Sequence, residues 1–497
     1  MFRWLSVSLV FHLVLAWFSL GFYHFDEHYQ ILEFASYKAG LIGASHLTWE
    51  YHAQIRSAFQ PYIAYCIIRI LQGLQNYDPY NVATILRFIS AILGWGSTLL
   101  VTIAGLFYVP NARMRKIFTI MSCVLAPLIF IHIRFSGEGW SGSLVFAGIA
   151  LVLLLIQKKN EMKQNKADVF FIISGFLMGL ACICRFQTAI IVFAFFVWLI
   201  FISKLQIKTL FFIVLGIFMA VLGGILLDRL FYGQWVNTAY RYFDVNLVQG
   251  VANSFGTEPW WWYAKAIAEN GVFVLQILMM LMVLIAFITK WKNPFVWVSA
   301  FFLIIHCIIS HKELRFLFPL INAMPILLIL GFDSLFSIFI TKESFNKMIF
   351  PSFVSFFVLL NTLSITYLCI KPPSSILYAM RYLYRYHPEP VNVIISDINV
   401  LRQTEGYLRM NFYERSQTHF IFLNKTDKDS VINLAKNNVV PLLLMEWEKG
   451  FDMKPAMGLL SVSFEASYTQ LPRWLERVNF NHWVDRTSCW QVHKIKI

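Results

Sequence analysis

The chain has 497 residues, of which 58% are hydrophobic and only 14% are charged, with a formal net charge of +14. A soluble chain carries about 25% charged residues, and 48 Phe and 16 Trp exceed what a water-exposed surface tolerates. These numbers exclude a soluble protein and indicate an integral membrane protein. The basic residues stand in short clusters between apolar stretches, which is typical of cytoplasmic loops near anionic lipid and does not predict a nucleic-acid partner.

The first apolar run, residues 4–22, is expected to be a retained membrane helix. It is long and aromatic for a signal peptide, and no small-residue cleavage site follows it. Further apolar runs recur along the chain, most of them long enough to cross about 30 Å of hydrocarbon. They cover residues 59–73, 87–109, 117–133, 141–157, 168–184, 188–203, 209–228, 270–289, 293–310, 315–338 and 348–370.

The run at 59–73 is short and contains Arg69, so we expect it to be an interfacial or re-entrant helix. If it does not span, all five basic clusters between the runs fall on the side of Arg3. The predicted topology then has about eleven crossings, a cytoplasmic N-terminus and an external C-terminal region. Four polar segments emerge together on the external face, which predicts an active site there. They are residues 23–57, 134–140, 229–268 and 311–314.

From about residue 371 the composition changes to short apolar segments that alternate with polar helical patterns. The expected strands are 391–395, 419–423 and 439–445, and the expected helices are 400–410 and 427–436. The chain is therefore predicted to have a transmembrane module, 1–370, with a catalytic first external loop, 23–57. A small external α/β domain, 371–497, follows it.

Asp26 and Glu27 lie side by side at the outer end of the first helix, flanked by His24 and His28. Adjacent carboxylates near hydrocarbon raise the pKa of one of them, which suits a general base that removes a proton from a sugar hydroxyl. The alternative is a hydrated loop that marks a membrane boundary.

Five polar or charged groups follow one another in His311-Lys312-Glu313-Leu314-Arg315-Phe316, between two apolar runs. Lys312 and Arg315 could hold a phosphate, and Glu313 could orient one of these cations. The alternative is a row of charges that snorkel at a helix end. Arg134, Glu138 and Arg185 lie on the same predicted face, where a lone Arg would more often be an interface anchor.

The stretch 228–263 is rich in Tyr, Trp, Asn and Gly and ends in Glu258-Pro259-Trp260-Trp261-Trp262-Tyr263. Aromatic faces stack on sugars, but Trp and Tyr also form the interface belt of membrane proteins, which is the better single explanation here.

These motifs, in this order, resemble glycosyltransferase family 22, with GPI mannosyltransferase III as the nearest type. His24-Phe25-Asp26-Glu27 stands in place of the family's His-Pro-Asp-Glu segment. Leu47-Thr48-Trp49-Glu50-Tyr51 and Ile55-Arg56-Ser57 look like its Leu-Thr-Trp-Glu-Trp and Ile-Arg-Ser block. Residues 311–316 are similar to its His-Lys-Glu-x-Arg-Phe signature. Two departures are Phe25 for the usual proline and Arg185-Phe186 for an Arg-Pro segment.

The resemblance implies a C-type membrane glycosyltransferase fold, a polyprenyl-phosphate mannose donor and an inverting transfer to a glycolipid or glycan hydroxyl. Asp26 is then the general base, and Glu27 and His24 tune it or position the acceptor. The donor phosphate is assigned to Lys312, Arg315, His311, Arg134 and Arg185. Acceptor or sugar binding is assigned to His24, Trp49, Glu50, Arg56, Glu138, Glu313 and Trp260.

No Cys/His spacing indicates a zinc site, and we expect no cofactor and no required divalent metal, since nearby cations can stabilise the phosphate. The external domain and modest length favour a bacterial inner-membrane protein with a periplasmic site over an ER protein with a lumenal one. The rival function is a transporter or flippase of lipid-linked sugars. Against it, the ionisable residues cluster at one face instead of the bilayer midplane, and no inverted repeat is present.

Overall fold

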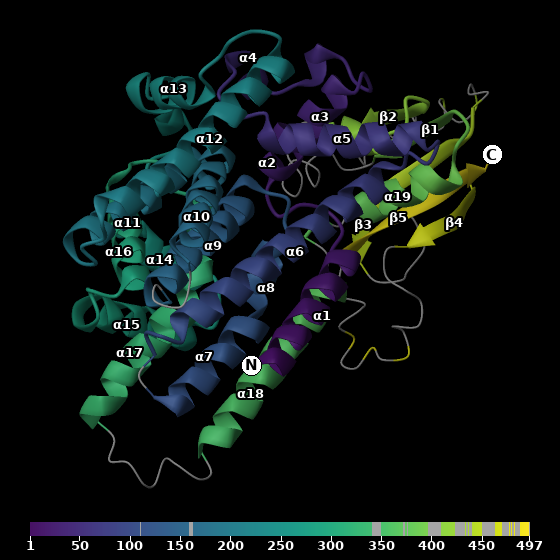
Figure 1. Ribbon diagram of the computed structural model, residues 1–497. Helices are drawn as coiled ribbons and strands as arrows, with labels where there is room; N and C mark the ends of the chain where they lie inside the picture. The colour runs from purple at the N-terminus through teal and green to yellow at the C-terminus, as the bar shows by residue number, and fades with distance from the viewer. Residues whose placement is uncertain are drawn as a thin grey trace. The chain divides into compact units, whose positions relative to one another are not determined.

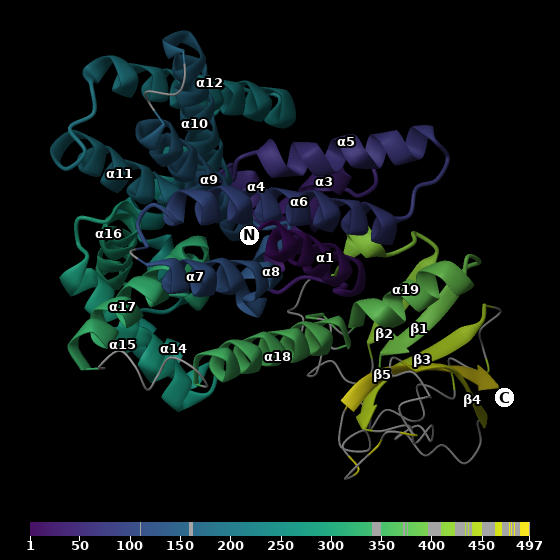
Figure 2. The ribbon, with the colours of Figure 1, turned by 60° about the horizontal axis from the view of Figure 1, so that its bottom comes forward.

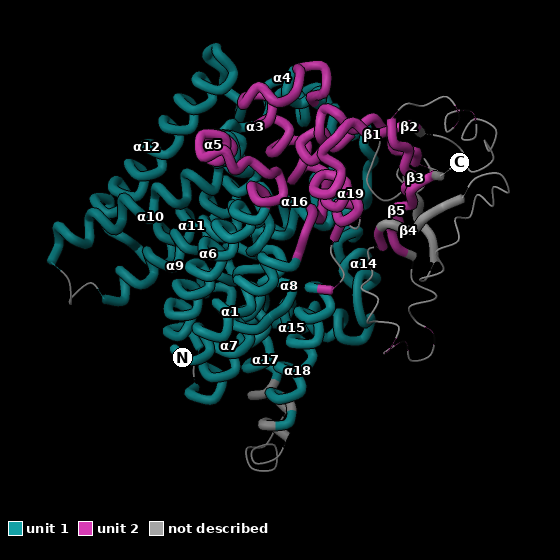
Figure 3. The backbone as a smooth tube through the Cα atoms, turned by 90° about the vertical axis from the view of Figure 1, so that its right-hand side faces the viewer, with its two compact units in different colours: residues 1–18, 48–67, 84–369 teal, residues 19–47, 68–83, 370–497 magenta. Residues whose placement is uncertain are grey.

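The computed structural model describes residues 1–109, 111–158, 163–339, 349–370, 373–374, 376–395, 409–422, 440–449, 463–469 and 488–496, and residues 433, 436, 477, 479 and 482. The chain divides into two compact units, coloured separately in Figure 3. Unit 1 comprises residues 1–18, 48–67 and 84–369, and unit 2 comprises residues 19–47, 68–83 and 370–497.

The regular elements of unit 1, among its described residues, are all helices. Its helices are α1 (Phe2–Phe18), α4 (Trp49–Ala53), α7 (Ala112–Val124), α8 (Ala126–His132), α9 (Gly137–Gln157), α10 (Gln164–Cys184), η3 (Phe186–Thr188), α11 (Ala189–Phe201), α12 (Ile207–Tyr232), α13 (Thr238–Phe243), η4 (Asp244–Val248), η5 (Val251–Phe255), α14 (Trp262–Glu269), α15 (Phe273–Thr289), α16 (Pro294–Ile308), η6 (Leu314–Ala323), α17 (Met324–Phe339) and α18 (Ile349–Ile370). Helices α5 (Phe59–Gly73) and α6 (Pro79–Gly105) run through the boundary between the units.

Among the described residues, five helices or helix pairs are individually long and apolar enough to cross a membrane, or up to seven if each of two bent pairs is one span. Three shorter apolar helices accompany them, including α1. The chain is thus a polytopic α-helical membrane protein, as its hydropathy predicts. Helix α5 has 15 residues, about 22 Å at 1.5 Å per residue. This is short for the ~30 Å hydrocarbon core. The interfacial placement of α5 and the total of eleven crossings stay predictions.

Helices α9, α10 and α12 lie side by side in unit 1 (Figures 1 and 2), and glycines permit their close approach. A Cβ on Gly175 of α10 would lie 1.9 Å from the carbonyl oxygen of Ile213, and one on Gly216 of α12 would lie 2.0 Å from that of Ile172. Both positions therefore require glycine. Small residues at such interfaces let helix backbones pack closely in lipid, where dispersion contacts replace the hydrophobic effect.

Unit 2 combines short helices from residues 19–47 and from the C-terminal region with a five-stranded sheet. The helices are α2 (Phe25–Glu27), η1 (His28–Leu32), α3 (Glu33–Lys38), η2 (Ala44–His46), α19 (Ile376–Tyr386) and η7 (Asn411–Tyr413). The strands are β1 (Val391–Ile395), β2 (Thr418–Phe422), β3 (Leu442–Lys449), β4 (Ser463–Thr469) and β5 (Ser488–Lys496). Helix α19 packs on the sheet (Figure 2), with the rings of Tyr382 and Tyr468 stacked at 4.7 Å.

The sheet order is β2-β1-β3-β5-β4. β1 pairs in parallel with β2 and β3, whereas β5 pairs antiparallel with β3 and β4. Three of the strands were predicted, with β2 displaced by one residue and β3 beginning three residues later than expected. The strands β4 and β5 and the helix α19 were not predicted. Most of the two helical patterns expected at 400–410 and 427–436 lies outside the described residues.

Candidate active site

Glu138 lies in the first turn of α9, at the centre of a buried charge cluster in unit 1. The helix begins after Ser136, whose hydroxyl accepts a hydrogen bond from the N–H of Gly139 at 3.0 Å. A Cβ on Gly137 would lie 2.9 Å from the carbonyl oxygen of Cys184, so the start of α9 directly abuts the end of α10. This approach places Glu138 beside Arg185, and the helix N-terminus itself favours a negative charge there.

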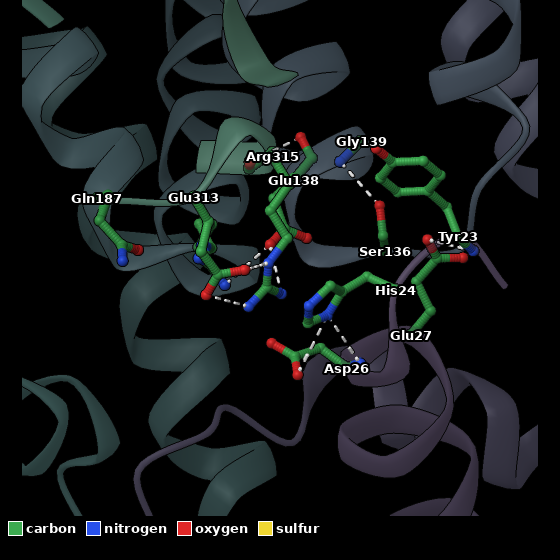
Figure 4. Close-up of polar contacts among 12 residues, drawn as sticks. Tyr23, His24, Asp26, Glu27, Ser136, Glu138, Gly139, Gln187, Glu313 and Arg315 are labelled. Carbon is green, nitrogen blue, oxygen red and sulfur yellow. Dashed lines mark hydrogen bonds and ion pairs between the residues drawn. The ribbon is translucent and has the colours of Figure 1, made fainter. Parts of the chain in front are cut away.

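Glu138 binds two arginines through one carboxylate oxygen. Its Oε1 is 3.1 Å from Nη1 of Arg185. The same oxygen is 3.2 Å from Nη1 of Arg315, which η6 supplies (Figure 4). The side chains of all three are less than 10% exposed. Such buried charges are tolerated only when they are paired and hydrogen-bonded, and here three separate segments of the chain provide the partners.

Glu313 adds a bidentate ion pair with Arg315. Arg315 donates from Nε to Oε2 of Glu313 at 2.6 Å and from Nη2 to Oε1 at 2.9 Å. The ring Nε2 of His311 is 3.2 Å from the same Oε1. We call Glu138, Arg185, His311, Glu313 and Arg315 the Glu138 cluster. It brings together five residues that the sequence selected from three separate motifs.

Lys312 and Arg134 are also buried, and their contacts differ from those of the Glu138 cluster. The ammonium of Lys312 donates to the backbone carbonyls of Glu258, at 3.0 Å, and Ile309. The guanidinium of Arg134 lies 4.6 Å from the ring centroid of Phe130. Trp260 is 72% exposed, and its assignment to sugar binding stays a prediction.

Residues 48–57 of the predicted acceptor block form a second polar group in unit 1. Arg56 donates to Oε1 of Glu50 from Nη2 at 2.6 Å and from Nε at 3.2 Å. Its own carbonyl accepts from the hydroxyl of Tyr232 at 2.7 Å. Trp49 faces Phe255, with ring centroids 6.5 Å apart, and Phe255 lies 6.3 Å from the ring of His311. Phe255, which the sequence did not single out, thus links this block to the Glu138 cluster.

Asp26 lies in unit 2 on the three-residue helix α2. His24 precedes the helix, and its Nδ1 accepts the N–H of Asp26 at 3.3 Å and lies 3.5 Å from the carboxylate Oδ1 (Figure 4). Glu27 turns back on the chain, where its Oε1 accepts the N–H of Tyr23 at 3.2 Å. The Asp26 carboxylate is 22% exposed. The two neighbouring carboxylates therefore have different partners.

Two buried carboxylates were not selected from the sequence as site residues. Asp228, at the end of α12, accepts from the N–H of Ala58 and from the hydroxyl of Thr238, both at 2.7 Å, and so fixes the start of α5. The sequence feature that could have identified Asp228 is an acidic residue at the end of an apolar run. Glu33 of α3 is 1% exposed, and an acid inside an otherwise apolar helix segment was the signal that could have revealed it.

The described residues contain no group of three or more His, Cys, Asp or Glu side chains arranged to hold a metal ion. The expectation that no divalent metal is required stays a prediction.

Comparisons with known proteins place the chain in a family. Residues 3–404 match the Alg9-like mannosyltransferase family. The chain is 27% identical over 330 residues to mannosyltransferase APTG1 of Arabidopsis thaliana, covering 65% of this chain and 56% of that protein. It is 25% identical over 321 residues to GPI mannosyltransferase 3 of Yarrowia lipolytica, covering 64% and 59%. It thus spans less than two thirds of the length of these relatives.

Among solved structures, the fold is similar to that of ArnT from Cupriavidus metallidurans bound to undecaprenyl phosphate. The TM-score is 0.53 at 11% identity, and the alignment covers 99% of this chain and 97% of that one. At this identity the likeness concerns the fold, which is that of a C-type membrane glycosyltransferase with a small C-terminal sheet domain. By the family match, the chain belongs to the Alg9-like mannosyltransferases.

Proposed function

We propose that the chain is an inverting mannosyltransferase that moves mannose from a polyprenyl-phosphate donor to a hydroxyl of a glycolipid or glycan acceptor. The observation that carries this proposal is the family match over residues 3–404, which spans both the Asp26 segment and the Glu138 cluster. The names of the relatives, GPI mannosyltransferases among them, support mannose as the sugar and a glycolipid as the acceptor. The family match also speaks against the transporter alternative.

Asp26 is the general base of the proposed reaction. Its carboxylate takes the proton of the acceptor hydroxyl as that oxygen attacks C1 of the sugar. The bond between C1 and the phosphate oxygen breaks, and the lipid phosphate leaves with the electron pair. Attack from the opposite face converts a β-linked donor into an α-linked product. The partial exposure of Asp26 supports this role, because a base must exchange its proton between turnovers.

The leaving phosphate needs positive charge at the place where its own charge develops. Arg315 and Arg185 are candidates, with Lys312, His311 and Arg134 as the further cations of the same loops. Glu138 and Glu313 hold both guanidiniums in position before a substrate arrives. Preorganised charge of this kind stabilises a transition state without the cost of reorganisation at the moment of reaction.

A polyprenyl phosphate is the proposed carrier of the sugar. The ArnT structure with the similar fold is bound to undecaprenyl phosphate, which supports a carrier of that chemical class. The site is assigned to the non-cytoplasmic face, following the distribution of basic clusters in the sequence. That face is periplasmic if the protein belongs to a bacterial inner membrane and lumenal if it belongs to the ER.

The test uses the purified full chain in detergent, with radiolabelled polyprenyl-phosphate mannose and a panel of glycolipid acceptors. The wild type is compared with Asp26→Asn, and with Glu269→Gln as a control that removes an exposed carboxylate of α14. We expect transfer by wild type and control and a loss of about 10²-fold or more in kcat for Asp26→Asn. Equal rates in all three would remove Asp26 from the role of base. Transfer from a different lipid-linked sugar only would overturn the choice of mannose.

A further inference from the structure

His28 and Glu33 form a buried pair within unit 2, outside the motifs assigned to substrate. Their side chains are 0% and 1% exposed, and Nε2 of His28 lies 2.9 Å from Oε1 of Glu33. The same Oε1 accepts the backbone N–H of Phe412 at 3.0 Å. One carboxylate oxygen therefore joins the first external loop to η7, a segment of the C-terminal region 379 positions away in sequence.

Aromatic rings hold the imidazole of His28 on several sides. The ring stacks on Phe22 and on Tyr413, each at 5.4 Å between centroids, and meets the edge of Tyr29 at 4.7 Å. Tyr413 is itself fixed, because its ring packs against Tyr80 at 5.0 Å and its carbonyl accepts from the hydroxyl of Tyr80. The element that receives His28 is thus well anchored inside the same unit.

His28 and Glu33 lie on the same helical stretch as Asp26. Helix α2 passes without a break into η1 and α3, because the backbone angles of Glu27, His28 and Glu33 are all helical. The backbone N–H of His28 donates to the carbonyl of Phe25. Because Asp26 is in the first turn of this stretch, its position depends on the contacts that hold the stretch, and His28 and Glu33 make two of them.

The energetics of the pair favour a positioning role over a purely stabilising one. Removing charges from water is costly, and apolar residues of similar volume often stabilise a fold as well as a buried ion pair does. This pair is also incompletely satisfied, since Nδ1 of His28 and Oε2 of Glu33 have no hydrogen-bond partner among the described residues. What an apolar replacement would lack is the directional link to the amide of Phe412.

From this geometry we propose that His28, Glu33 and the amide of Phe412 form a clamp that positions Asp26. His28 and Glu33 are positioning residues, and through the amide of Phe412 the C-terminal region takes part in positioning Asp26. The catalytic part of this inference rests on the proposed role of Asp26. The mechanical part, that the clamp restrains residues 24–32, does not.

The test measures amide hydrogen exchange and kinetics on the full chain carrying Glu33→Leu, which removes the acceptor of both bonds. We expect faster exchange confined to residues 24–32 and a fall in kcat of about 10–100-fold, as for other supporting residues of active sites. The donor KM should change less than about threefold, since no substrate contact is removed. Glu33→Gln keeps an oxygen that can accept from Phe412, so it should recover most of both effects.

Arg385→Gln is the matched control, because it breaks a more exposed pair of the same unit, with Asp78 at 2.9 Å. Exchange of residues 24–32 and kcat should stay at wild-type values in this variant. Unchanged exchange in Glu33→Leu would overturn the clamp, as would equal acceleration across all of unit 2. If Glu33→Leu does not fold, His28→Phe replaces it. This variant keeps an aromatic ring and removes only the contact between His28 and Glu33, so both effects should have the same direction and be smaller.

The two proposals can fail separately. A wild type that transfers no mannose would overturn the proposed function. Amide hydrogen exchange needs no substrate, so it would still decide whether the clamp exists. A fully active Asp26→Asn variant would overturn the catalytic part of the clamp.

Discussion

The carboxylates of the two units are held in opposite ways. Glu138 of unit 1 is 6% exposed and shared by two arginines, one of which also grips Glu313 with two bonds. Asp26 of unit 2 is 22% exposed and lies 3.5 Å from His24, in the first turn of a helical stretch. A carboxylate held between buried guanidiniums is a fixed charge, because protonating it would leave those cations without their partner. Asp26 is the more exposed of the two, which is compatible with its proposed role as general base.

The comparison distinguishes the fixed charges of the Glu138 cluster from Asp26, the proposed reactive group. The Glu138 cluster contributes by keeping cations in place, so damage to it should affect folding together with activity. Damage to Asp26 should affect the chemical step with little change in folding. Mutations can test this division directly.

The largest effect on stability is expected from Glu138→Gln. It leaves Arg185 and Arg315 buried with one carboxylate fewer, and removing one partner of a buried pair costs about 3–5 kcal/mol. Asp26→Asn should change the free energy of unfolding by less than about 0.5 kcal/mol. Thermal unfolding in detergent measures both, with Glu269→Gln as the exposed control. Equal destabilisation by the two substitutions would abolish the distinction between fixed charge and reactive group.

A smaller effect is expected when the cations are changed and their charge is kept. Arg315→Lys cannot reproduce the two bonds to Glu313 together with the bond to Glu138, because an ammonium lacks the planar fork. Losing charge-assisted bonds of about 1.5–3 kcal/mol predicts a fall in kcat/KM of roughly 10–100-fold. Arg185→Lys replaces one bond to Glu138 and should cost less. Steady-state kinetics measure kcat/KM for both variants. A larger loss in Arg185→Lys than in Arg315→Lys would contradict the central place of Arg315.

The sequence predicted the membrane helices well because hydropathy is a local signal. The runs at 141–157 and 168–184, for example, lie within α9 (Gly137–Gln157) and α10 (Gln164–Cys184). The pairing of Glu138 with two arginines could not be predicted, since it depends on the close approach of α9 and α10 at Gly137. The sequence also could not predict that Lys312 donates to the backbone carbonyl of Glu258, because this contact joins residues 54 positions apart.

Strand β5 shows why much of the C-terminal sheet was missed. Its core-facing pattern is obscured because Gln491 and His493 are almost fully buried alongside Trp490 and Val492. A strand with buried polar residues does not alternate in hydrophobicity, so the period-two signal is lost. Likewise, nothing local in residues 19–47 indicates that they share a compact unit with residues 370–497.

Glu414 offers an intermediate between the two kinds of carboxylate. Its side chain is 8% exposed and paired at 2.6 Å with Arg409, which is 47% exposed. Burial raises the pKa of Glu414, and the charge of Arg409 offsets this only in part. A raised pKa of an acid in the folded state favours its protonated form, so the stability it contributes is present at low pH and is lost as pH rises through the folded pKa.

Glu414→Gln should therefore weaken the loss of stability as pH rises from acidic to neutral values. Unfolding midpoints at acidic and at neutral pH measure it, with Glu269→Gln as the exposed control. A steeper dependence in the Glu414→Gln variant would mean that Arg409 more than compensates for the burial.

The smallest effect is expected from removal of divalent metal. If Arg315 and Arg185 stabilise the leaving phosphate, EDTA should change the transfer rate by less than about twofold, because positive charge is supplied by side chains that carboxylates already hold in place. Dialysis against EDTA, followed by transfer assays with and without added Mg²⁺ or Mn²⁺, measures this. A loss of activity that either ion restores would mean that the arginines are insufficient and that carboxylates such as Asp26 and Glu27 act as ligands. In that case Asp26→Asn would abolish the response to metal as well as the transfer rate. If Asp26 instead acts as a base without metal, the residual activity of the Asp26→Asn variant should be as insensitive to EDTA as the wild type.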